Sequence, residues 1–223
     1  MYEDDENVVL QIYELWCSIS DIEIERIKFK VEIKEYCDKF KDKLLGYIKY
    51  SLSNRKEHED QEAWTTTKGA NALLTNLGKC THGDLIDYIT SIMGEFLASD
   101  KVQLIDSAML IFGSVMDTIH EQKIYSIVVE ALDNILGYLN HKSSLVRKTT
   151  AWVLERICEV HTKNLSKDKF ETIIQVIIQN LRSNELNKKI IINMLNALHQ
   201  MSQHYRSQVI KLHMTSSILM LIL

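Results

Sequence analysis

The sequence predicts an all-α fold, an α-solenoid in which antiparallel helix pairs stack side by side. Three observations support this prediction. Apolar residues recur at helical spacing along most of the chain. The 223 residues include 7 glycines and no proline, so the turn dipeptides that a β-sandwich or barrel needs are scarce. Finally, a pair of large apolar residues three positions apart returns at nearly regular intervals, which is typical of helical repeats.

The most regular helical pattern lies in SSLVRKTTAWVLERICE, residues 143–159. Its apolar residues are separated by steps of three and four, so they line one broad face of a helix. Ser143 and Ser144 offer side-chain oxygens that can cap the first turn. We therefore expect a helix over residues 143–160, preceded by a turn at residues 140–142.

The same periodicity predicts helices on both sides of this stretch. Their expected ranges are 7–19, 38–52, 63–80, 83–98, 101–116, 121–139, 169–182 and 187–205, with most of a tenth helix at 207–223. Residues 21–37 are rich in both charges and are expected to form a loop or a frayed extra helix, and residues 53–62 a charged loop. The other connections have roughly two to six residues, the length expected between antiparallel neighbours.

The second helix of each expected pair carries the recurring signature. Its members are Trp16/Ile19, Leu74/Leu77, Phe112/Val115, Leu154/Ile157 and Leu198/Met201. The first members lie 58, 38, 42 and 44 residues apart, and the longest interval contains both charged stretches. Spacings of roughly forty residues are typical of HEAT repeats, whose helix pairs bury their apolar stripes only against neighbouring pairs.

We therefore predict one solenoid over residues 1–223, a right-handed superhelix of HEAT repeats similar to armadillo repeats. It would contain about four full repeats, at 38–80, 83–118, 121–162 and 166–205, with partial repeats at each end. First helices would form an outer row and second helices an inner row. Because both ends carry apolar residues without an obvious polar cap, we expect the chain to be a piece of a longer solenoid.

Composition argues against several classes of protein. Lys and Arg number 26 and Asp and Glu 30, a formal net charge of −4, which does not suggest a nucleic-acid partner. The longest uninterrupted apolar run, Ile218–Leu223, is far too short to span a membrane. The cysteines Cys17, Cys37, Cys80 and Cys158 include no C-x-x-C pair, so reduced thiols in a cytosolic or nuclear protein are expected.

Motifs that carry catalysis are absent from the sequence. It contains no phosphate-binding Gly-rich loop, no G-x-S-x-G and no H-E-x-x-H. We therefore expect no enzyme activity, no cofactor and no metal site.

One aromatic residue and a neighbouring charged segment are the candidates for binding a partner. Trp64 either holds the preceding loop against the helix that follows or clamps the stem of a Lys or Arg by a cation–π contact. The acidic segment, residues 57–62, either is simply solvated or steers a basic partner electrostatically. Its acidic residues are Glu57, Glu59, Asp60 and Glu62.

Residues 145–161, LVRKTTAWVLERICEVH, resemble one repeat of the importin-β (karyopherin-β) nuclear transport receptors, which carry a similar V-R-x-T-x-A-W-x-x-x-R-I-C-E run. Three further segments resemble the same family in the same order. They are LQIYELWCSISDIE (10–23), EHEDQEAWTTTKGANALLTNL (57–77) and DLIDYITSIMGEFLASDKVQLIDSAMLIFGSVMD (84–117). The resemblance covers about residues 7–205. It implies that this chain consists of repeats from the N-terminal half of a receptor.

The resemblance implies non-covalent binding of several partners. Inner helices would bind the basic importin-β-binding segment of the adaptor importin-α, or a cargo protein. The acidic segment would meet a basic patch on the GTPase Ran. Outer helices, mostly in repeats outside this chain, would take Phe-Gly repeats of nucleoporins. The implied location is the cytoplasm and nucleus, including the nuclear pore. A HEAT-repeat scaffold subunit of another assembly, of the phosphatase or coat type, is the alternative.

Site residues follow from the same resemblance. Trp64 matches an inner-face Trp that clamps the aliphatic stem of a basic residue. The acidic segment matches the family's acidic loop, and Asp21 and Glu23 match acidic residues at the end of an earlier inner helix. Two features depart from the family. In the first, Arg55, Lys56 and His58 lie in or beside the acidic segment and dilute its negative charge. The other departure is Asn196, which stands where the family has a second inner Trp.

Overall fold

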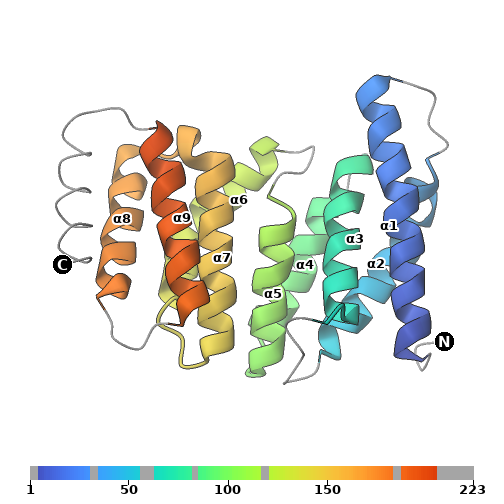
Figure 1. Cartoon of the computed structure of the whole chain (residues 1–223), viewed down its shortest axis with the longest axis horizontal. Coiled ribbons are helices and arrows are strands. Elements are labelled where there is room, and N and C mark those ends of the chain that lie inside the picture. Colours follow the sequence, from blue (N-terminus) through green and yellow to red (C-terminus); the bar gives the residue numbers. More distant parts are fainter. Residues whose placement is uncertain are drawn as a thin grey trace. The chain divides into compact units, whose positions relative to one another are not determined.

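The computed structural model describes residues 5–30, 35–55, 63–81, 85–116, 121–182 and 187–204, which form nine α-helices, one short 3-10 helix and no strand (Figure 1). The α-helices are α1 (Glu6–Phe29), α2 (Tyr36–Ser53), α3 (Thr66–Cys80), α4 (Leu85–Leu97), α5 (Val102–Ser114), α6 (Glu121–Tyr138), α7 (Ser144–His161), α8 (Lys167–Leu181) and α9 (Lys188–His204). The 3-10 helix η1 is Thr162–Asn164. Of the helices described, none combines the length and the apolarity that a membrane crossing requires.

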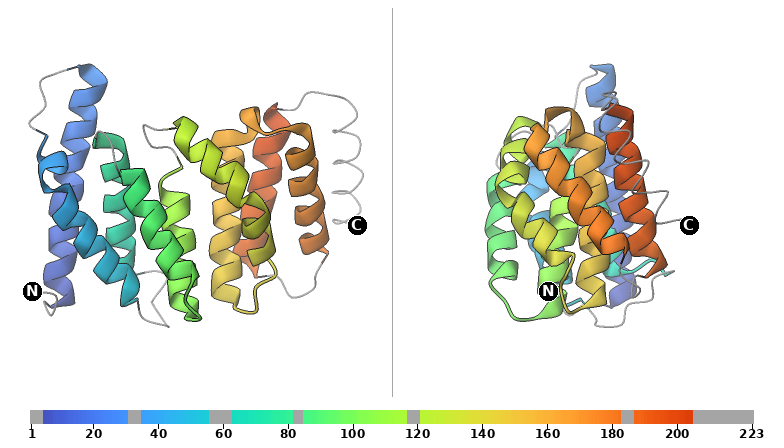
Figure 2. Two further views of the ribbon diagram at one scale, coloured as in Figure 1. Left: turned by 180° about the vertical axis from the view of Figure 1, so that it is seen from behind. Right: turned by 90° about the vertical axis from the view of Figure 1, so that its left-hand side faces the viewer.

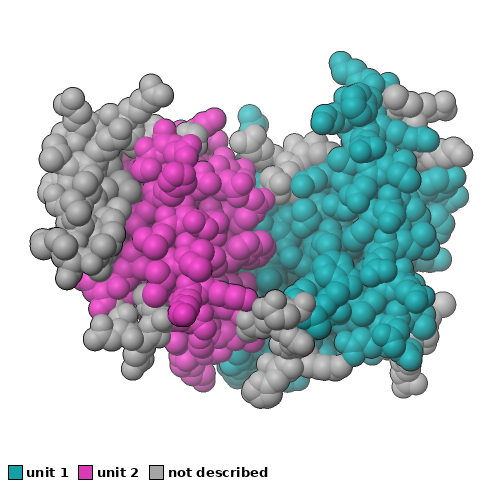
Figure 3. All heavy atoms as spheres, viewed as in Figure 1, with its two compact units in different colours: residues 1–124 teal, residues 125–223 magenta. Residues whose placement is uncertain are grey.

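The chain divides into two compact units, Met1–Ile124 and Tyr125–Leu223 (Figure 3). In the first unit, α1, α3 and α5 lie side by side in one layer, with α1 and α5 packed on either side of α3 (Figure 1). Helices α2 and α4 form the second layer, which faces the viewer when the molecule is seen from behind (Figure 2). The predicted second helices therefore share one layer and the predicted first helices the other.

The second unit repeats this arrangement. Helices α7 and α9 pack side by side, and α8 packs against α9. Lys169 on α8 forms an ion pair with Asp133 on α6, with 2.9 Å between Nζ and Oδ1. At the other end of α6, the Tyr125 hydroxyl donates a hydrogen bond to the carbonyl of Asn164 in η1. Helices α6 and α8 thus lie next to each other as the first helices of two successive pairs.

The recurring signature occupies equivalent buried positions in four helices. Its residues in α3, α7 and α9, and in α5 with its C-cap residue Val115, are at most 2% exposed; they are Leu74/Leu77, Phe112/Val115, Leu154/Ile157 and Leu198/Met201. In α1, Trp16 and Ile19 are only half-buried, and Trp16 lies against Phe40 of α2 with 5.4 Å between ring centroids. Within each unit the helices therefore pack as the predicted all-α fold of antiparallel helix pairs requires.

The expectation of a loop or separate frayed helix at residues 21–37 is wrong for its first half. Helix α1 continues without a break through Phe29 and ends at Lys30, which is left-handed with φ 54°. The Lys30 N–H donates to the carbonyls of Arg26 and Ile27, as in a common helix C-cap. The many charges in this stretch concealed the helix, although it contains neither Gly nor Pro to end it.

Smaller differences concern helix starts. Helix α3 begins at Thr66, so Trp64 lies just outside it. Ser143 precedes α7 as expected but makes no side-chain cap hydrogen bond. The Arg147 guanidinium instead donates to the carbonyl oxygens of His141 and Lys142, at 2.8 and 3.1 Å. The expected tenth helix at 207–223 and the expected start at residues 83–84 lie outside the described residues.

Tyr13 connects three helices of the first unit. Its hydroxyl hydrogen-bonds the carbonyl of Tyr47 at 2.9 Å and the hydroxyl of Ser51 at 2.7 Å, both on α2. Its ring lies against Gly69 of α3, where an added Cβ would stand only 3.0 Å from the ring. A side chain at residue 69 would therefore require the Tyr13 ring to move by a few tenths of an ångström.

A second buried contact joins the end of α2 to α5. The Arg55 guanidinium forms an ion pair with the carboxylate of Asp106, which is 0% exposed. On the next residue, the Ser107 hydroxyl donates to the carbonyl of Leu52 at 2.9 Å. Both contacts hold the chain against α5 immediately before the acidic segment begins.

We expect Gly69→Ala to lower the free energy of unfolding by about 1–3 kcal/mol, the usual cost of overpacking a core. The Tyr13 ring cannot move aside easily because its hydroxyl is held by two hydrogen bonds. Urea unfolding followed by circular dichroism measures the change. The control is Gly94→Ala on α4, where an added Cβ meets nothing within 4 Å. There alanine should stabilise by about 0.5–1 kcal/mol, and an equal gain at Gly69 would contradict the close contact.

We expect Arg55→Ala to destabilise the first unit by about 3–5 kcal/mol, because it leaves the buried Asp106 carboxylate without its guanidinium. Replacing both residues, as in Arg55→Met with Asp106→Leu, should cost much less, since no charge then remains buried. Unfolding free energies of the single and double variants give this comparison. If the double variant is as unstable as Arg55→Ala, the loss of stability in Arg55→Ala does not come from an unpaired Asp106 carboxylate.

Candidate partner-binding surface

Trp64 lies on the surface at the start of α3. Its side chain is 47% exposed, which is high for a tryptophan. The next residue, Thr65, is the N-cap of α3, and its hydroxyl oxygen accepts a hydrogen bond from the backbone N–H of Lys68 at 3.3 Å. Thr65 and Thr67 are 8% and 3% exposed. The backbone on the C-terminal side of Trp64 is therefore fixed, while the indole faces solvent.

The four acidic residues of the acidic segment, Glu57, Glu59, Asp60 and Glu62, lie outside the described residues. Its two ends are described: Arg55 is held by Asp106 on one side, and Trp64 precedes the Thr65 cap on the other. Both ends of the segment therefore belong to the first unit.

Asp21 lies where α1 and α3 meet. It is exposed, and one carboxylate oxygen accepts a hydrogen bond from the side-chain amide of Asn76 on α3 at 2.9 Å. The same amide donates to the Ser20 hydroxyl at 3.0 Å. Asp21 therefore keeps acceptor capacity toward solvent, beside the C-terminal half of α3, whereas Trp64 precedes the start of that helix.

Glu23 does not share that surface, and its expected role in partner binding does not fit its place in the fold. It is 3% exposed. Its carboxylate accepts hydrogen bonds from the backbone N–H groups of Tyr36 at 2.6 Å and Cys37 at 3.2 Å. These belong to the first turn of α2, whose N-cap residue Glu35 makes no side-chain cap bond. Glu23 thus caps a neighbouring helix from inside the protein.

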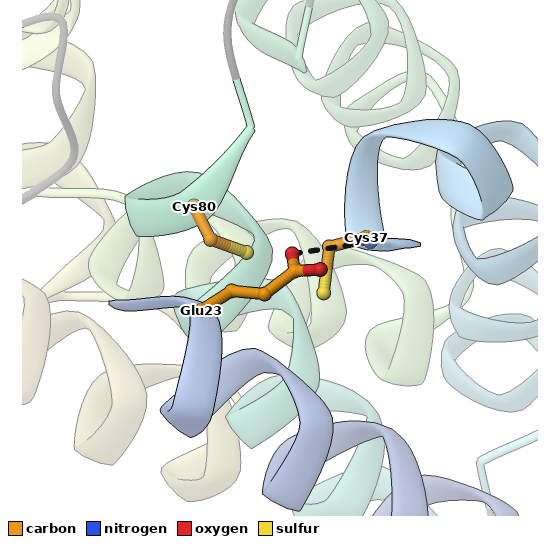
Figure 4. A group of neighbouring side chains, drawn as sticks. All are labelled: Glu23, Cys37 and Cys80. Carbon is orange, nitrogen blue, oxygen red and sulfur yellow. Dashed lines mark hydrogen bonds between the residues drawn. The ribbon is translucent and has the colours of Figure 1, made fainter. Parts of the chain in front are cut away.

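A cluster that sequence spacing did not reveal surrounds Glu23. Cys37 at the start of α2 and Cys80 at the end of α3 lie beside its carboxylate (Figure 4). The contact with the Cys80 thiol, burial and the nearby Glu23 carboxylate raise the pKa of Cys37, so this thiol stays protonated at neutral pH. Since α2 and α3 run antiparallel, the first residues of one and the last of the other meet at the same end.

The corresponding layer of the second unit has its own polar contacts. The Asn196 side-chain amide on α9 donates to the Glu155 carboxylate on α7 at 2.9 Å. Burial raises the pKa of Glu155, and the hydrogen bond from Asn196 partly opposes this. An asparagine thus bridges to an acidic residue of the adjacent helix in both units. Asn196 therefore connects α9 to α7 within the second unit.

A hollow lies between α6 and α8 in the second unit. Gly137 on α6 opens it, because a Cβ there would meet nothing within 4 Å. Leu136 and Val176 provide its apolar wall, and Asp133 and Asn140 are among its polar residues. Its chemistry suits an apolar side chain flanked by polar groups.

Comparisons with known proteins give a consistent result. The chain is 29% identical over 197 residues to importin subunit beta-1 of Arabidopsis thaliana, covering 80% of this chain and 23% of that protein. It is 21% identical over 199 residues to importin subunit beta-1 of Schizosaccharomyces pombe, again covering 23% of the relative. No family model matches the sequence.

Solved structures show the same fold. The structure of yeast importin-β (Kap95p) matches with a TM-score of 0.79 at 18% identity, over 92% of this chain and 25% of that chain. A crystal structure of importin-β in an ammonium sulfate condition matches with a TM-score of 0.81 at 19% identity, with the same coverage. In sequence and in fold, the chain therefore resembles importin-β, over a region that spans about a quarter of the length of those proteins.

Proposed function

We propose that this chain is part of a nuclear import receptor of the importin-β type and that it binds a basic segment of importin-α or of a cargo protein. The observation that carries the proposal is the exposed Trp64 at the α1–α3 layer of an importin-β-like fold. Binding would be non-covalent. A receptor of this kind would move between cytoplasm and nucleus.

The surface around Trp64 has the chemistry that a basic helix requires. An exposed indole fixed at a helix start offers its face to the stem and charge of a Lys or Arg. Asp21 adds a carboxylate with acceptor capacity further along α3, where it meets Asn76. The acidic segment adds negative charge next to Trp64 in sequence and would attract a basic partner from a distance. Glu23 is left out of this surface because its carboxylate is buried.

We propose Ran as the second partner, bound through the acidic segment. One of the structural neighbours is yeast Kap95p in a complex with Ran, which this chain matches with a TM-score of 0.79. Since Ran and the basic segment would use neighbouring parts of the first unit, binding of one should weaken binding of the other.

Nucleoporins are the third proposed partner class. A structure of the Kap95:Nup1 complex matches with a TM-score of 0.78. The hollow between α6 and α8 lies between successive first helices, which the sequence assigns to the outer row. We propose that it takes the phenyl ring of a Phe-Gly repeat.

Trp64→Ala should weaken binding of a Lys/Arg-rich helical peptide while leaving stability nearly unchanged. A cation–π contact of about 0.5–2 kcal/mol corresponds to roughly 2- to 30-fold in Kd. Fluorescence anisotropy with a labelled importin-α segment measures this, and affinity should fall as salt rises. Ile192→Ala on α9, which removes another exposed apolar side chain, is the matched control and should bind normally.

Two further arms decide between specific and generic binding. Adding Ran loaded with GTP should displace the peptide. The contrary outcome is a charge-matched scrambled peptide that binds as tightly as the original peptide, and as tightly to Trp64→Ala as to the unchanged chain. Binding would then depend only on overall charge, and the proposed role of Trp64 would be wrong.

For the nucleoporin partner, Gly137→Leu should fill the hollow and weaken binding of a Phe-Gly peptide without lowering stability, because residue 137 has open space around it. Gly94→Leu, at another open glycine outside the hollow, is the control. Chemical-shift changes on adding peptide report binding. Equal binding by both variants would place Phe-Gly recognition elsewhere.

A further inference from the structure

Three helices of the first unit bring metal-ligand side chains to one buried point. Cys37 is 0%, Glu23 3% and Cys80 5% exposed. The two sulfur atoms and a carboxylate oxygen all lie within 4.8 Å of one another (Figure 4). Figure 4 shows the three side chains converging from α1, α2 and α3.

The spacing and the atom types suit a thiophilic divalent cation. Zn²⁺ binds Cys sulfur at about 2.3 Å and carboxylate oxygen at about 2.0–2.2 Å. Tetrahedral coordination at those lengths separates ligand atoms by roughly 3.5–3.8 Å. An ion therefore needs only small side-chain movements to be bound by all three residues. Two sulfurs and one oxygen favour zinc over magnesium or calcium, which prefer oxygen alone.

The hydrogen bonds of Glu23 do not prevent it from binding a cation. A carboxylate has about four acceptor positions, and the N–H groups of Tyr36 and Cys37 use two of them. Metal-bound carboxylates are usually held by such hydrogen bonds, which fix their orientation. The same two bonds that cap α2 would therefore hold Glu23 in place as a ligand.

Charge is a separate observation in favour of a cation. Glu23 is a buried carboxylate, and within the described ranges no Lys, Arg or His side chain forms an ion pair with it. Buried carboxylates are otherwise paired or bound to metals. With both thiols deprotonated, Glu23 and the two sulfurs carry three negative charges. A divalent cation balances two of them, and the backbone N–H groups at the start of α2 partly offset the third.

We propose that Glu23, Cys37 and Cys80 form a Zn²⁺ site, with a water molecule in the fourth position of the ion. Each thiol gives its proton to solvent as the metal–sulfur bond forms. The site would connect α1, α2 and α3 close to the seam that carries Asp21. Its role would be structural, holding the helix that bears the proposed partner surface against its neighbours.

Metal content of the full chain tests the proposal directly. The protein is purified under reducing conditions without a His tag, passed through a desalting column and analysed for zinc. We expect about one Zn²⁺ per chain, and a chromophoric chelator should take it up when thiols are modified. Cys37→Ser and Cys80→Ser should lower zinc affinity at least tenfold. Cys158→Ser, at another fully buried cysteine, is the matched control and should keep the metal.

Co²⁺ added to the unmodified chain keeps the test independent of whether a variant folds. Two thiolate ligands should give a sulfur-to-cobalt charge-transfer band that saturates at one ion per chain, and Zn²⁺ should remove it. The band should be absent from the double variant Cys37→Ser/Cys80→Ser. No such band, or zinc content equal to that of the double variant, would overturn the proposal. So would a Cys37–Cys80 disulfide that forms in air in the presence of zinc.

Discussion

Apolar stripes that no single helix can cover are the constraint on which this structure depends. In the first unit α3 shows this most clearly, because α1, α2 and α5 all pack against it. Leu73, Leu74 and Leu77 are at most 2% exposed only because these three neighbours surround them. Burial of a leucine contributes about 1.5–3 kcal/mol, so each helix is stable through contacts that other helices provide.

This mutual burial also explains what the sequence could predict. Helix periods and the spacing of the signature located all the described α-helices, although not the full length of α1 and not η1. This was possible because residues such as Phe112 and Leu154 are buried against neighbouring helices in each pair. What periodicity could not predict was chemistry set by tertiary contacts. The end of α1 was concealed by charges at residues 21–29, one of which, Glu23, turns inward to cap another helix. Charge patterns alone do not distinguish an exposed carboxylate from a buried cap.

The candidate surface was partly predictable for a related reason. Trp64 stands between an acidic segment and a cap residue, and both the pattern and the resemblance to importin-β singled it out; the structure places it on the surface. The meeting of Cys37 and Cys80 was not foreseen, because 43 positions separate them in the sequence. Antiparallel pairing of α2 and α3 brings them together, and such contacts become visible only when helix ends are known to within a turn.

Hydrogen exchange of the full chain, compared with Leu77→Ala, tests the dependence of each helix on its neighbours most directly. Leu77 is 0% exposed in α3, so its truncation removes apolar contacts that are shared with the adjoining helices. If stacking is the stabilising interaction, backbone amides of α1 and α2 should lose protection together with those of α3. Loss of protection confined to α3, with α1 and α2 exchanging as in the unchanged chain, would contradict it.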